Sequence, residues 1–533
     1  MQNNRLKQVR VIVSLAVLIV LTAALVEGSP RLLSTVGGWL ASVQFVPSSV
    51  ALVSGGALSL ACIVILLLTL LAGRIYCSFL CPLGTLQDIA IRLRSILEKK
   101  KSRVQYAKPA TRVRIGFLLL TLIGIVSGWA SIVLALLDPY SNYGRIVSVL
   151  IRPLIKFGGG TVLGWIRPAA ADSWLETAHW ASLGALAVPI IVLGLVATMA
   201  ALRGRLYCNT VCPVGTLLGL ISSRSAFRLQ IDHGCRKCAK CARVCKTQCI
   251  DWRTGSLDNS RCVACYNCIG VCDGHFIGYR QSWILPQRNL KPALVEINTE
   301  TRSVPDYRRR ALLSKTLLVL AGGLATETLW AGTGQKDIAA ASDTGLDGNR
   351  KERRAIRPPG FVSAERFSDH CTACQLCVSA CPSYVLRPSS LEFAVSNLLK
   401  PRMSFDNSYC KYDCNRCGEV CPSGAIQALS LAEKQRTRLG LANVDESHCL
   451  VNTRQAACTI CIRRCPAKAI ETIPFGNNLH MPKVNALLCI GCGRCEYECP
   501  AEPEKAIKVA GLLRETHVPP NAPATSHLLT APS

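Results

Sequence analysis

Six groups of four cysteines, each with nearly the same internal spacing, constrain this 533-residue chain more than any other feature. Four of the groups read C-x2-C-x2-C-x3-C, and in the other two the first gap widens to three and to eight residues. Disulfide frameworks belong to short secreted domains and have irregular spacings. A repeated formula that takes 24 of the 30 cysteines therefore indicates that thiolates bind metal.

Zinc and iron–sulfur clusters are the two kinds of metal centre that four cysteines commonly hold. Structural zinc uses two C-x2-C pairs, whereas here three closely spaced cysteines precede a trailing fourth. This is the ligand run of bacterial [4Fe–4S] ferredoxins, in which the fourth cysteine binds the neighbouring cluster. The spacing therefore predicts six [4Fe–4S] clusters, two in an earlier segment and four in a later one.

In the earlier segment, the crossed arrangement assigns every ligand. The first cluster is expected on Cys235, Cys238, Cys241 and Cys272, and the second on Cys262, Cys265, Cys268 and Cys245. The expected iron ligands of the later segment are Cys371, Cys374, Cys377, Cys381, Cys410, Cys414, Cys417, Cys421, Cys449, Cys458, Cys461, Cys465, Cys489, Cys492, Cys495 and Cys499.

Apolar residues gather in the first 205 positions, before nearly all the cysteines. A membrane-spanning helix needs about 20 of them, and four stretches lack charge for long enough: Val11–Val26, Ser48–Gly73, Ile115–Leu137 and Leu183–Leu202. Lys and Arg are concentrated before the first stretch and between the second and third, which predicts that both ends of this four-helix unit are cytoplasmic. We attribute the net charge of +28 to this topology and not to nucleic-acid binding.

An internal repeat lies within the apolar part. The segment Gly73–Leu86 recurs as Gly204–Leu217, and each copy contains Tyr-Cys-x3-Cys-Pro. If the two helical hairpins pack symmetrically, the four thiols meet at the cytoplasmic surface near the first clusters. The thiols are Cys77, Cys81, Cys208 and Cys212. Two interpretations stay open. The thiols form a redox or metal site or a dithiol pair, or they only pack.

Two arginines, Arg309 and Arg310, precede the weakly apolar stretch Thr316–Thr326, which is typical of a twin-arginine export signal. The alternative is a basic triplet before a buried helix or a fifth apolar segment. We therefore expect an α-helical membrane bundle joined to α+β ferredoxin-like domains. The expected domains are a four-helix membrane domain (1–220), a two-cluster ferredoxin domain (221–285), a linker with the signal or fifth segment (286–360), a four-cluster ferredoxin domain (361–515) and a disordered tail (516–533).

Several kinds of site are missing from the sequence. No span carries paired histidines for haem b, no glycine-rich loop indicates a nucleotide, and no catalytic residues stand out. A quinol is then the natural substrate of a carrier embedded in membrane lipid. Polar residues at the outer ends of the spans could serve its proton chemistry, although each can also be a simple interfacial residue. They are Glu27, Asp138, Arg145, Glu176 and His179.

Residues 1–290, with four spans, the duplicated Tyr-Cys-x3-Cys-Pro and a two-cluster ferredoxin, resemble the NapH-type (MauN-type) membrane ferredoxins. The part from Arg309 to Leu513 resembles their NapG-type (MauM-type) four-cluster partner. The resemblance implies a multi-pass quinol dehydrogenase component of the bacterial inner membrane, with its first ferredoxin domain cytoplasmic and its second periplasmic. It would pass electrons to a periplasmic reductase, such as a nitrate reductase, or to a cytochrome.

Similar four-cluster subunits imply a pairing in which the first and last motifs share clusters, as do the middle two. Cys499 would then complete the cluster of Cys371, and Cys381 that of Cys489. Cys465 would likewise serve the group of Cys410, and Cys421 that of Cys449. A different class of function, an accessory redox or maturation factor for a periplasmic metalloenzyme, is the alternative to electron transfer. An exported second domain also raises a difficulty, because a hydrocarbon core of about 30 Å separates the two sets of clusters.

Overall fold

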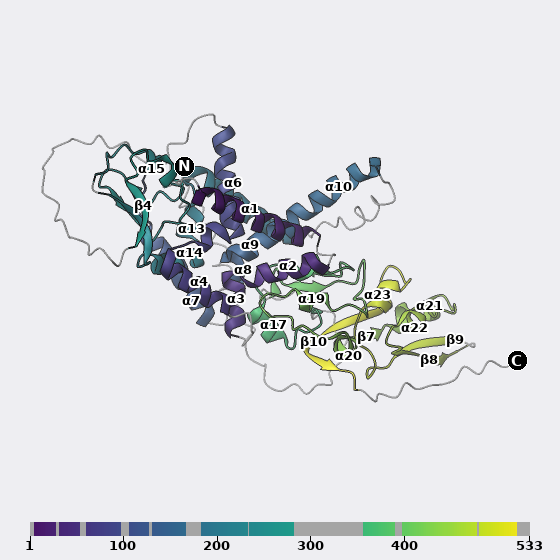
Figure 1. Cartoon of the computed structure of the whole chain (residues 1–533). Coiled ribbons are helices and arrows are strands. Elements are labelled where there is room, and N and C mark those ends of the chain that lie inside the picture. Colours follow the sequence, from purple (N-terminus) through teal and green to yellow (C-terminus); the bar gives the residue numbers. More distant parts are fainter. Residues whose placement is uncertain are drawn as a thin grey trace. The chain divides into compact units, whose positions relative to one another are not determined.

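The computed structural model describes residues 5–27, 31–53, 60–97, 106–126, 130–166, 183–232, 234–281, 355–389, 397–476 and 479–519. All of them belong to one compact unit, made of residues 1–285 and 353–533 (Figure 1). The expected export signal at Arg309 and Arg310, the stretch Thr316–Thr326 and the expected outer residues Glu176 and His179 lie outside the described residues, as does the end of the expected tail.

Within the described part, two helices are long and apolar enough to cross a bilayer, α1 (Arg5–Val26) and α12 (Leu183–Arg203). The other two expected spans are each described as a pair of shorter helices, α3 (Phe45–Val53) with α4 (Leu60–Ala72) and α7 (Thr111–Val126) with α8 (Ala130–Leu137). The few residues between the members of each pair lie outside the description, so the four-span arrangement stays a proposal. A further helix, α2 (Arg31–Ser42), joins α1 to α3.

The segment after α8 folds into α9 (Pro139–Arg145), the π-helix η3 (Ile146–Ile151) and α10 (Arg152–Ile166). Asp138 starts α9, because its carboxylate accepts hydrogen bonds from the backbone N–H groups of Tyr140 and Ser141 at 3.3 and 2.8 Å. Pro139 occupies the first helical position, where its missing N–H costs nothing.

The two copies of the internal repeat follow the same course. In the first, α5 (Tyr76–Phe79) leads into α6 (Pro82–Leu97), and in the second, α13 (Leu206–Thr210) leads into α14 (Pro213–Ser222). Each copy turns out of the preceding long helix at a glycine with positive φ, Gly73 at 75° and Gly204 at 70°. Helix α6 packs against α9 and α12, while α14 packs against α4 and α7.

The first ferredoxin domain is small and irregular. Strands β1 (Phe227–Ile231) and β4 (Ile277–Gln281) pair antiparallel, with Leu229 opposite Tyr279. Between them lie α15 (Lys240–Arg243), the short hairpin β2 (Ile250–Asp251) and β3 (Ser256–Leu257), and the 3-10 helix η4 (Ile269–Val271). Both cysteine groups therefore lie in the chain segment between the two paired strands, β1 and β4.

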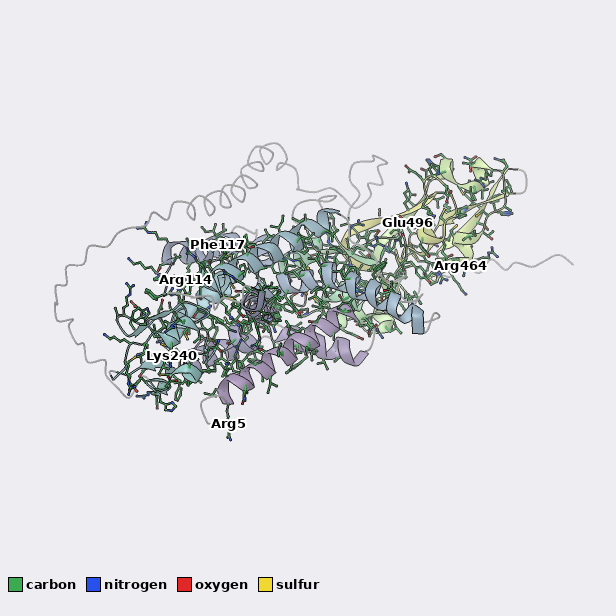
Figure 2. All side chains as sticks on the ribbon, turned by 90° about the horizontal axis from the view of Figure 1, so that it is seen from above. Arg5, Arg114, Phe117, Lys240, Arg464 and Glu496 are labelled. Carbon is green, nitrogen blue, oxygen red and sulfur yellow. The ribbon has the colours of Figure 1, made fainter. Side chains whose placement is uncertain are left out.

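In its described residues the second ferredoxin domain contains three antiparallel strand pairs, β5–β6, β7–β10 and β8–β9. Its elements are α17 (Ala364–His370), α18 (Leu376–Ala380), β5 (Leu386–Pro388), β6 (Pro401–Met403), α19 (Arg416–Glu419), α20 (Leu431–Arg436), β7 (Thr437–Val444), η6 (Glu446–His448), α21 (Leu450–Thr453), α22 (Ile460–Arg464), β8 (Ile470–Phe475), β9 (Leu479–Val484), α23 (Arg494–Glu498) and β10 (Ile507–His517). Figure 2 shows side chains filling the spaces between these ribbons.

The two ferredoxin domains contact opposite ends of the helical hairpins. The first meets the end of α4, where the backbone N–H of Ala226 donates to Leu70 O at 2.9 Å and the Tyr279 hydroxyl donates to Ala72 O at 2.6 Å. The second contacts α1, α8 and η3 through α17 and α18. One buried apolar cluster extends from Leu21 in α1 to Leu376 in α18.

Candidate iron–sulfur centres

Cavities in the second ferredoxin domain are lined by cysteines from two motifs each. One gathers Cys465 with Cys489, Cys492 and Cys495, a second gathers Cys499 with Cys449, Cys458 and Cys461, and a third gathers Cys381 with Cys410, Cys414 and Cys417. Cys421 lies within electrostatic reach of the remaining trio Cys371, Cys374 and Cys377. Each cavity thus has three thiols from one loop and a fourth from a neighbouring motif, as a cubane requires.

The expected pairing of the first motif with the last, and of the middle two, is wrong. Adjacent motifs pair instead: Cys421 and not Cys499 joins Cys371, and Cys465 and not Cys381 joins Cys489. The reason is local folding, since β5 pairs with β6 to bring the first two motifs together. In the same way α22 packs on α23 and joins the last two motifs.

The four motifs with strict spacing share an unusual backbone. In each, both residues that flank the second cysteine have positive φ, as at Ala373 (55°) and Gln375 (65°) around Cys374. Such a conformation is rare for residues other than glycine. Two left-handed residues in five curl the loop tightly, so that its three thiols converge on one side. The two motifs with widened gaps lack this pattern at the equivalent positions.

The distances between thiols differ between a zinc site and an iron–sulfur cluster. Among the described residues, no three His, Cys, Asp or Glu side chains lie close enough to hold a single metal ion. A tetrahedral zinc site with bonds of about 2.3 Å draws its sulfurs to within about 4 Å of one another. Each thiolate of a cubane binds a different iron and therefore stands farther away. The cavities lined by four cysteines therefore fit a cluster.

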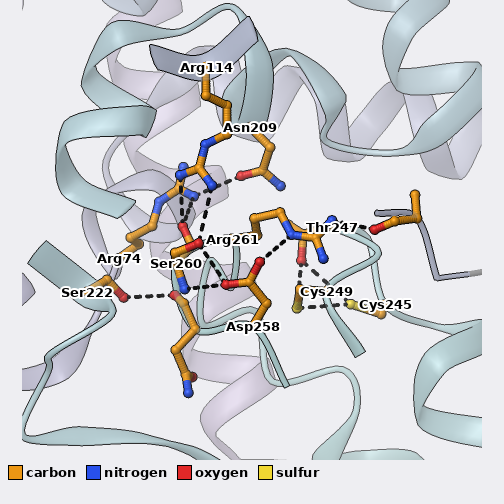
Figure 3. A network of polar contacts seen from close by, with 12 residues as sticks. Arg74, Arg114, Asn209, Ser222, Cys245, Thr247, Cys249, Asp258, Ser260 and Arg261 are labelled. Atoms are coloured by element: carbon orange, nitrogen blue, oxygen red, sulfur yellow. Dashed lines mark hydrogen bonds and ion pairs between the residues drawn. The ribbon is translucent and has the colours of Figure 1, made fainter. Parts of the chain in front are cut away.

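The first domain gathers Cys245, Cys262, Cys265 and Cys268 around one cavity, which is the set that the crossed arrangement groups together. The thiol of Cys241 lies near those of Cys235 and Cys238. Cys249, to which the sequence assigned no role, lines the same cavity as Cys245. Its Sγ lies 3.5 Å from Cys245 Sγ and accepts a hydrogen bond from the Thr247 hydroxyl at 3.2 Å (Figure 3). In the sequence, only the position of Cys249 four residues after Cys245 could have indicated that it lies beside the cluster site.

Because two thiols lie at one corner of this cavity, we expect Cys249 to replace Cys245 as an iron ligand. The Cys245→Ala protein should keep its iron content, with an altered electron paramagnetic resonance (EPR) spectrum of one cluster. The Cys249→Ala protein should match the wild type, and the double variant should lose about four irons per chain. Loss of the cluster in the Cys245→Ala protein alone would show that Cys249 is only a packing residue.

The expected outer polar residues have structural partners. Asp138 caps α9, and its carboxylate also accepts a hydrogen bond from the Ser141 hydroxyl at 2.6 Å. Arg145 is buried and donates to Ala135 O and, at 2.7 Å, to Asn142 Oδ1. Glu27 lies half-buried just after α1. The structure thus gives Asp138 and Arg145 roles in shaping the segment that meets the second ferredoxin domain.

The four repeat thiols come together and are buried. Cys77, Cys81, Cys208 and Cys212 are between 3 and 5% exposed. The thiol of Cys212 lies within electrostatic reach of the other three. Their surroundings include two fully buried arginines, which sequence reasoning did not identify.

Asp88, in α6, is a largely buried hub that the sequence also did not reveal. Its carboxylate contacts Arg205 Nε at 2.8 Å, Lys246 Nζ at 2.9 Å, and Arg10. Burial alone would raise the pKa of Asp88, but the charges of Arg205, Lys246 and Arg10 hold it well below its ordinary value. One carboxylate therefore joins α1, the second repeat and the first ferredoxin domain.

A second polar network joins the bundle to the first domain (Figure 3). Arg74 donates to Asn209 Oδ1 at 2.8 Å and to Ser260 O at 3.1 Å, and Arg114 donates to the Ser260 hydroxyl at 3.2 Å. Asp258, beside Ser260, is paired with Arg261 at 2.7 Å. The loop before the second cysteine group is thereby fixed to the first repeat and to α7.

Converging loops of cysteines in two small α+β domains define an iron–sulfur protein of the ferredoxin type, built for electron transfer. A family model described as a 4Fe-4S binding domain matches residues 54–102 and again 185–231, and a 4Fe-4S dicluster domain model matches residues 370–425. The ferredoxin-type protein NapG of Escherichia coli (strain K12) is 32% identical over 222 residues, which cover 40% of this chain and 90% of that protein. The chain belongs to the NapG ferredoxin-type family.

Two other relatives match parts of the chain. The methylamine utilization ferredoxin-type protein MauM of Methylobacillus flagellatus is 32% identical over 29% of this chain and 67% of its own length. The ferredoxin-type protein NapF of Escherichia coli is 28% identical over 28% of this chain and 84% of its own length. No solved structure matches the chain.

Proposed function

We propose that this protein is a membrane-bound quinol dehydrogenase component with six motif-bound [4Fe–4S] clusters, which passes electrons to a periplasmic reductase or cytochrome. In this proposal residues 1–290 form a NapH-type (MauN-type) membrane ferredoxin, fused to the NapG-type part. Each quinol gives up two protons and two electrons, and the clusters accept the electrons one at a time. The names of the relatives, ferredoxin-type proteins of the Nap and methylamine utilization systems, support the electron-transfer part of this proposal.

The observation that carries the proposal is the docking of the two ferredoxin domains at opposite ends of the hairpins. The first domain contacts the end of α4, at Leu70 and Ala72. The second contacts the segment after α8, where the Lys156 ammonium donates to the Tyr384 hydroxyl at 3.2 Å and Arg152 lies over the same ring. In the proposed four-span arrangement α4 and α8 run in opposite directions across the membrane, so this docking favours cytoplasmic clusters on one side and periplasmic clusters on the other.

Quinol oxidation can be tested directly. Full-length protein in anaerobic liposomes should lose cluster absorbance near 420 nm when a short-chain menaquinol is added, because electrons enter the clusters. Dithionite gives the absorbance change for complete reduction. Clusters that dithionite reduces but no quinol reduces would rule out the quinol step and leave electron transfer from another donor.

A maturation factor is the alternative function, in which the repeat thiols would reduce a partner enzyme under assembly. Thiol exchange needs an accessible thiolate. The four repeat thiols are at most 5% exposed, which favours electron transfer over this alternative. A partner enzyme that is inactive and metal-deficient in cells lacking this protein would favour maturation instead.

A further inference from the structure

Resting on the electron-transfer function proposed above, we propose that Cys77, Cys81, Cys208 and Cys212 together hold one additional iron–sulfur cluster, which relays electrons between the two ferredoxin domains. Each repeat coincides with one of the two segments matched by the 4Fe-4S binding domain model, and each supplies only two of these thiols. A cluster with four thiolate ligands therefore requires both copies.

The first argument is the placement of the thiols. Cys81 and Cys212 stand directly before the first turns of α6 and α14. The backbone N–H of Gly215 donates to Cys212 Sγ at 3.3 Å, and that of Gly84 donates to Cys81 in the same way. Gln87 adds a third donor, its Nε2 lying 3.3 Å from Cys208 Sγ. Hydrogen bonds to ligand sulfurs are a regular feature of iron–sulfur sites and help to set their potentials.

The second argument is a reciprocal pair of arginine contacts. Arg74 of the first repeat donates to Cys208 O of the second at 3.2 Å, and Arg205 of the second donates to Cys77 O of the first at 2.7 Å. A methyl group on Gly84 would lie 2.6 Å from Cys77 O, too close for any side chain. The two loops are thereby fixed in one register, as a site that needs ligands from both would require.

The third argument is charge. Arg74 and Arg205 are fully buried beside the thiols, and Arg10 and Lys246 lie close by. Asp88 supplies one negative charge against these four positive charges. Arg205 Nη2 has no partner among the described residues. Neutral thiols would leave this positive charge uncompensated, whereas a cluster bound by four thiolates is an anion that would offset it.

The fourth argument is position. On one side, the backbone N–H of Arg205 donates at 2.8 Å to the carbonyl of Lys246, the residue after the ligand Cys245. On the other side, the Tyr207 hydroxyl accepts a hydrogen bond from Asn142 Nδ2 at 3.4 Å. Gly144, two residues after Asn142, has its backbone against the carbonyl of the ligand Cys374.

This path divides the gap of about 30 Å that separates clusters on the two faces of a membrane. The additional centre would take one electron from a reduced cluster of one domain and give it to an oxidised cluster of the other. No covalent bond to a substrate forms or breaks, and quinol remains the source of the electrons.

Other uses of the four thiols fit less well. No three of them lie close enough for one metal ion, since no such group exists among the described residues, which disfavours zinc. All four cysteines are free thiols in the structure and none forms a disulfide.

The test compares iron and sulfide contents of full-length protein purified anaerobically in detergent. The Cys77→Ser/Cys208→Ser and Cys81→Ser/Cys212→Ser variants should each lose two to about four irons per chain and one EPR signal, while the signals of the motif clusters persist. The control is Cys62→Ser, a buried cysteine of α4 outside the site, which should keep all its iron. The persisting signals show that the variants are folded.

Unchanged iron and spectra in both double variants would overturn the proposal, as would stoichiometric zinc or a disulfide between these cysteines in the wild-type protein. The quinol test in liposomes is independent of these results. If no quinol reduces the clusters but the site holds iron, only the quinol step fails. If quinol reduces the first-domain clusters and the site holds no iron, only the relay fails.

Discussion

Replacing Asp88 by asparagine is expected to lower the thermal stability of the protein strongly and to expose the first ferredoxin domain to protease. The change leaves Arg205, which is fully buried, and Lys246 and Arg10 without their carboxylate. Removing one partner of a buried ion pair costs about 3–5 kcal/mol. The measurement is thermal unfolding in detergent, together with limited proteolysis.

Asp273→Asn is the matched control, because Asp273 pairs with Lys240 on the surface, where the two side chains are 77% and 52% exposed. Surface ion pairs contribute little, so this variant should melt like the wild type. Equal melting temperatures for the Asp88 and Asp273 variants would show that the hub does not hold the domains together.

The Asp88 effect should also depend on pH. Because the folded protein holds the pKa of Asp88 below its ordinary value of 3.8, the hub contributes its full stabilisation above that value. The contribution is lost as the pH falls through the lowered pKa of the folded state. The stability difference between wild type and Asp88→Asn should therefore stay constant from pH 8 to pH 5 and shrink only in stronger acid.

The cluster pairing in the second domain has the other large expected effect. If Cys421 and Cys371 bind the same cluster, the Cys421→Ala/Cys371→Ala protein should lose about four irons, no more than either single variant. Cys421→Ala combined with Cys449→Ala should lose about eight, because Cys421 lies near the Cys371 group whereas Cys449 lines a different cavity.

The pairing that the family resemblance implied predicts the reverse, with about eight irons lost in the first double variant and about four in the second. Iron and sulfide per chain, measured on protein purified anaerobically, distinguish the two outcomes. The result does not depend on whether the membrane part binds a quinol.

The sequence predicted the thiols within each loop better than the partnership between loops. An x2 gap fixes three cysteines on one turn of chain, so Cys489, Cys492 and Cys495 could be grouped from spacing alone. Which motif supplies the fourth thiol depends on which loops pack together, and here β5–β6 pairing and the α22–α23 contact decide it. No spacing along the chain records such contacts.

The helices show the same division between local and distant signals. Asp138-Pro139 is a local start signal for α9 that can be read from the sequence, although our sequence analysis predicted no helix there. The Asp88 hub has no local signal, because its partners Arg10 and Arg205 lie 78 and 117 residues away. The repeat was visible, but the burial of its thiols depends on helices that cover them from elsewhere in the chain.

The reciprocal arginine contacts have a consequence for how such a chain can diverge. Arg74 supports the cysteine loop of the second repeat, and Arg205 supports that of the first. Each copy of the duplicated segment therefore supports the cysteine loop of the other copy. A substitution in one copy is then selected for its effect on both copies. A protein with a single copy could rebuild this arrangement only as a symmetric homodimer, and the covalent duplication frees the two halves to bind different neighbours.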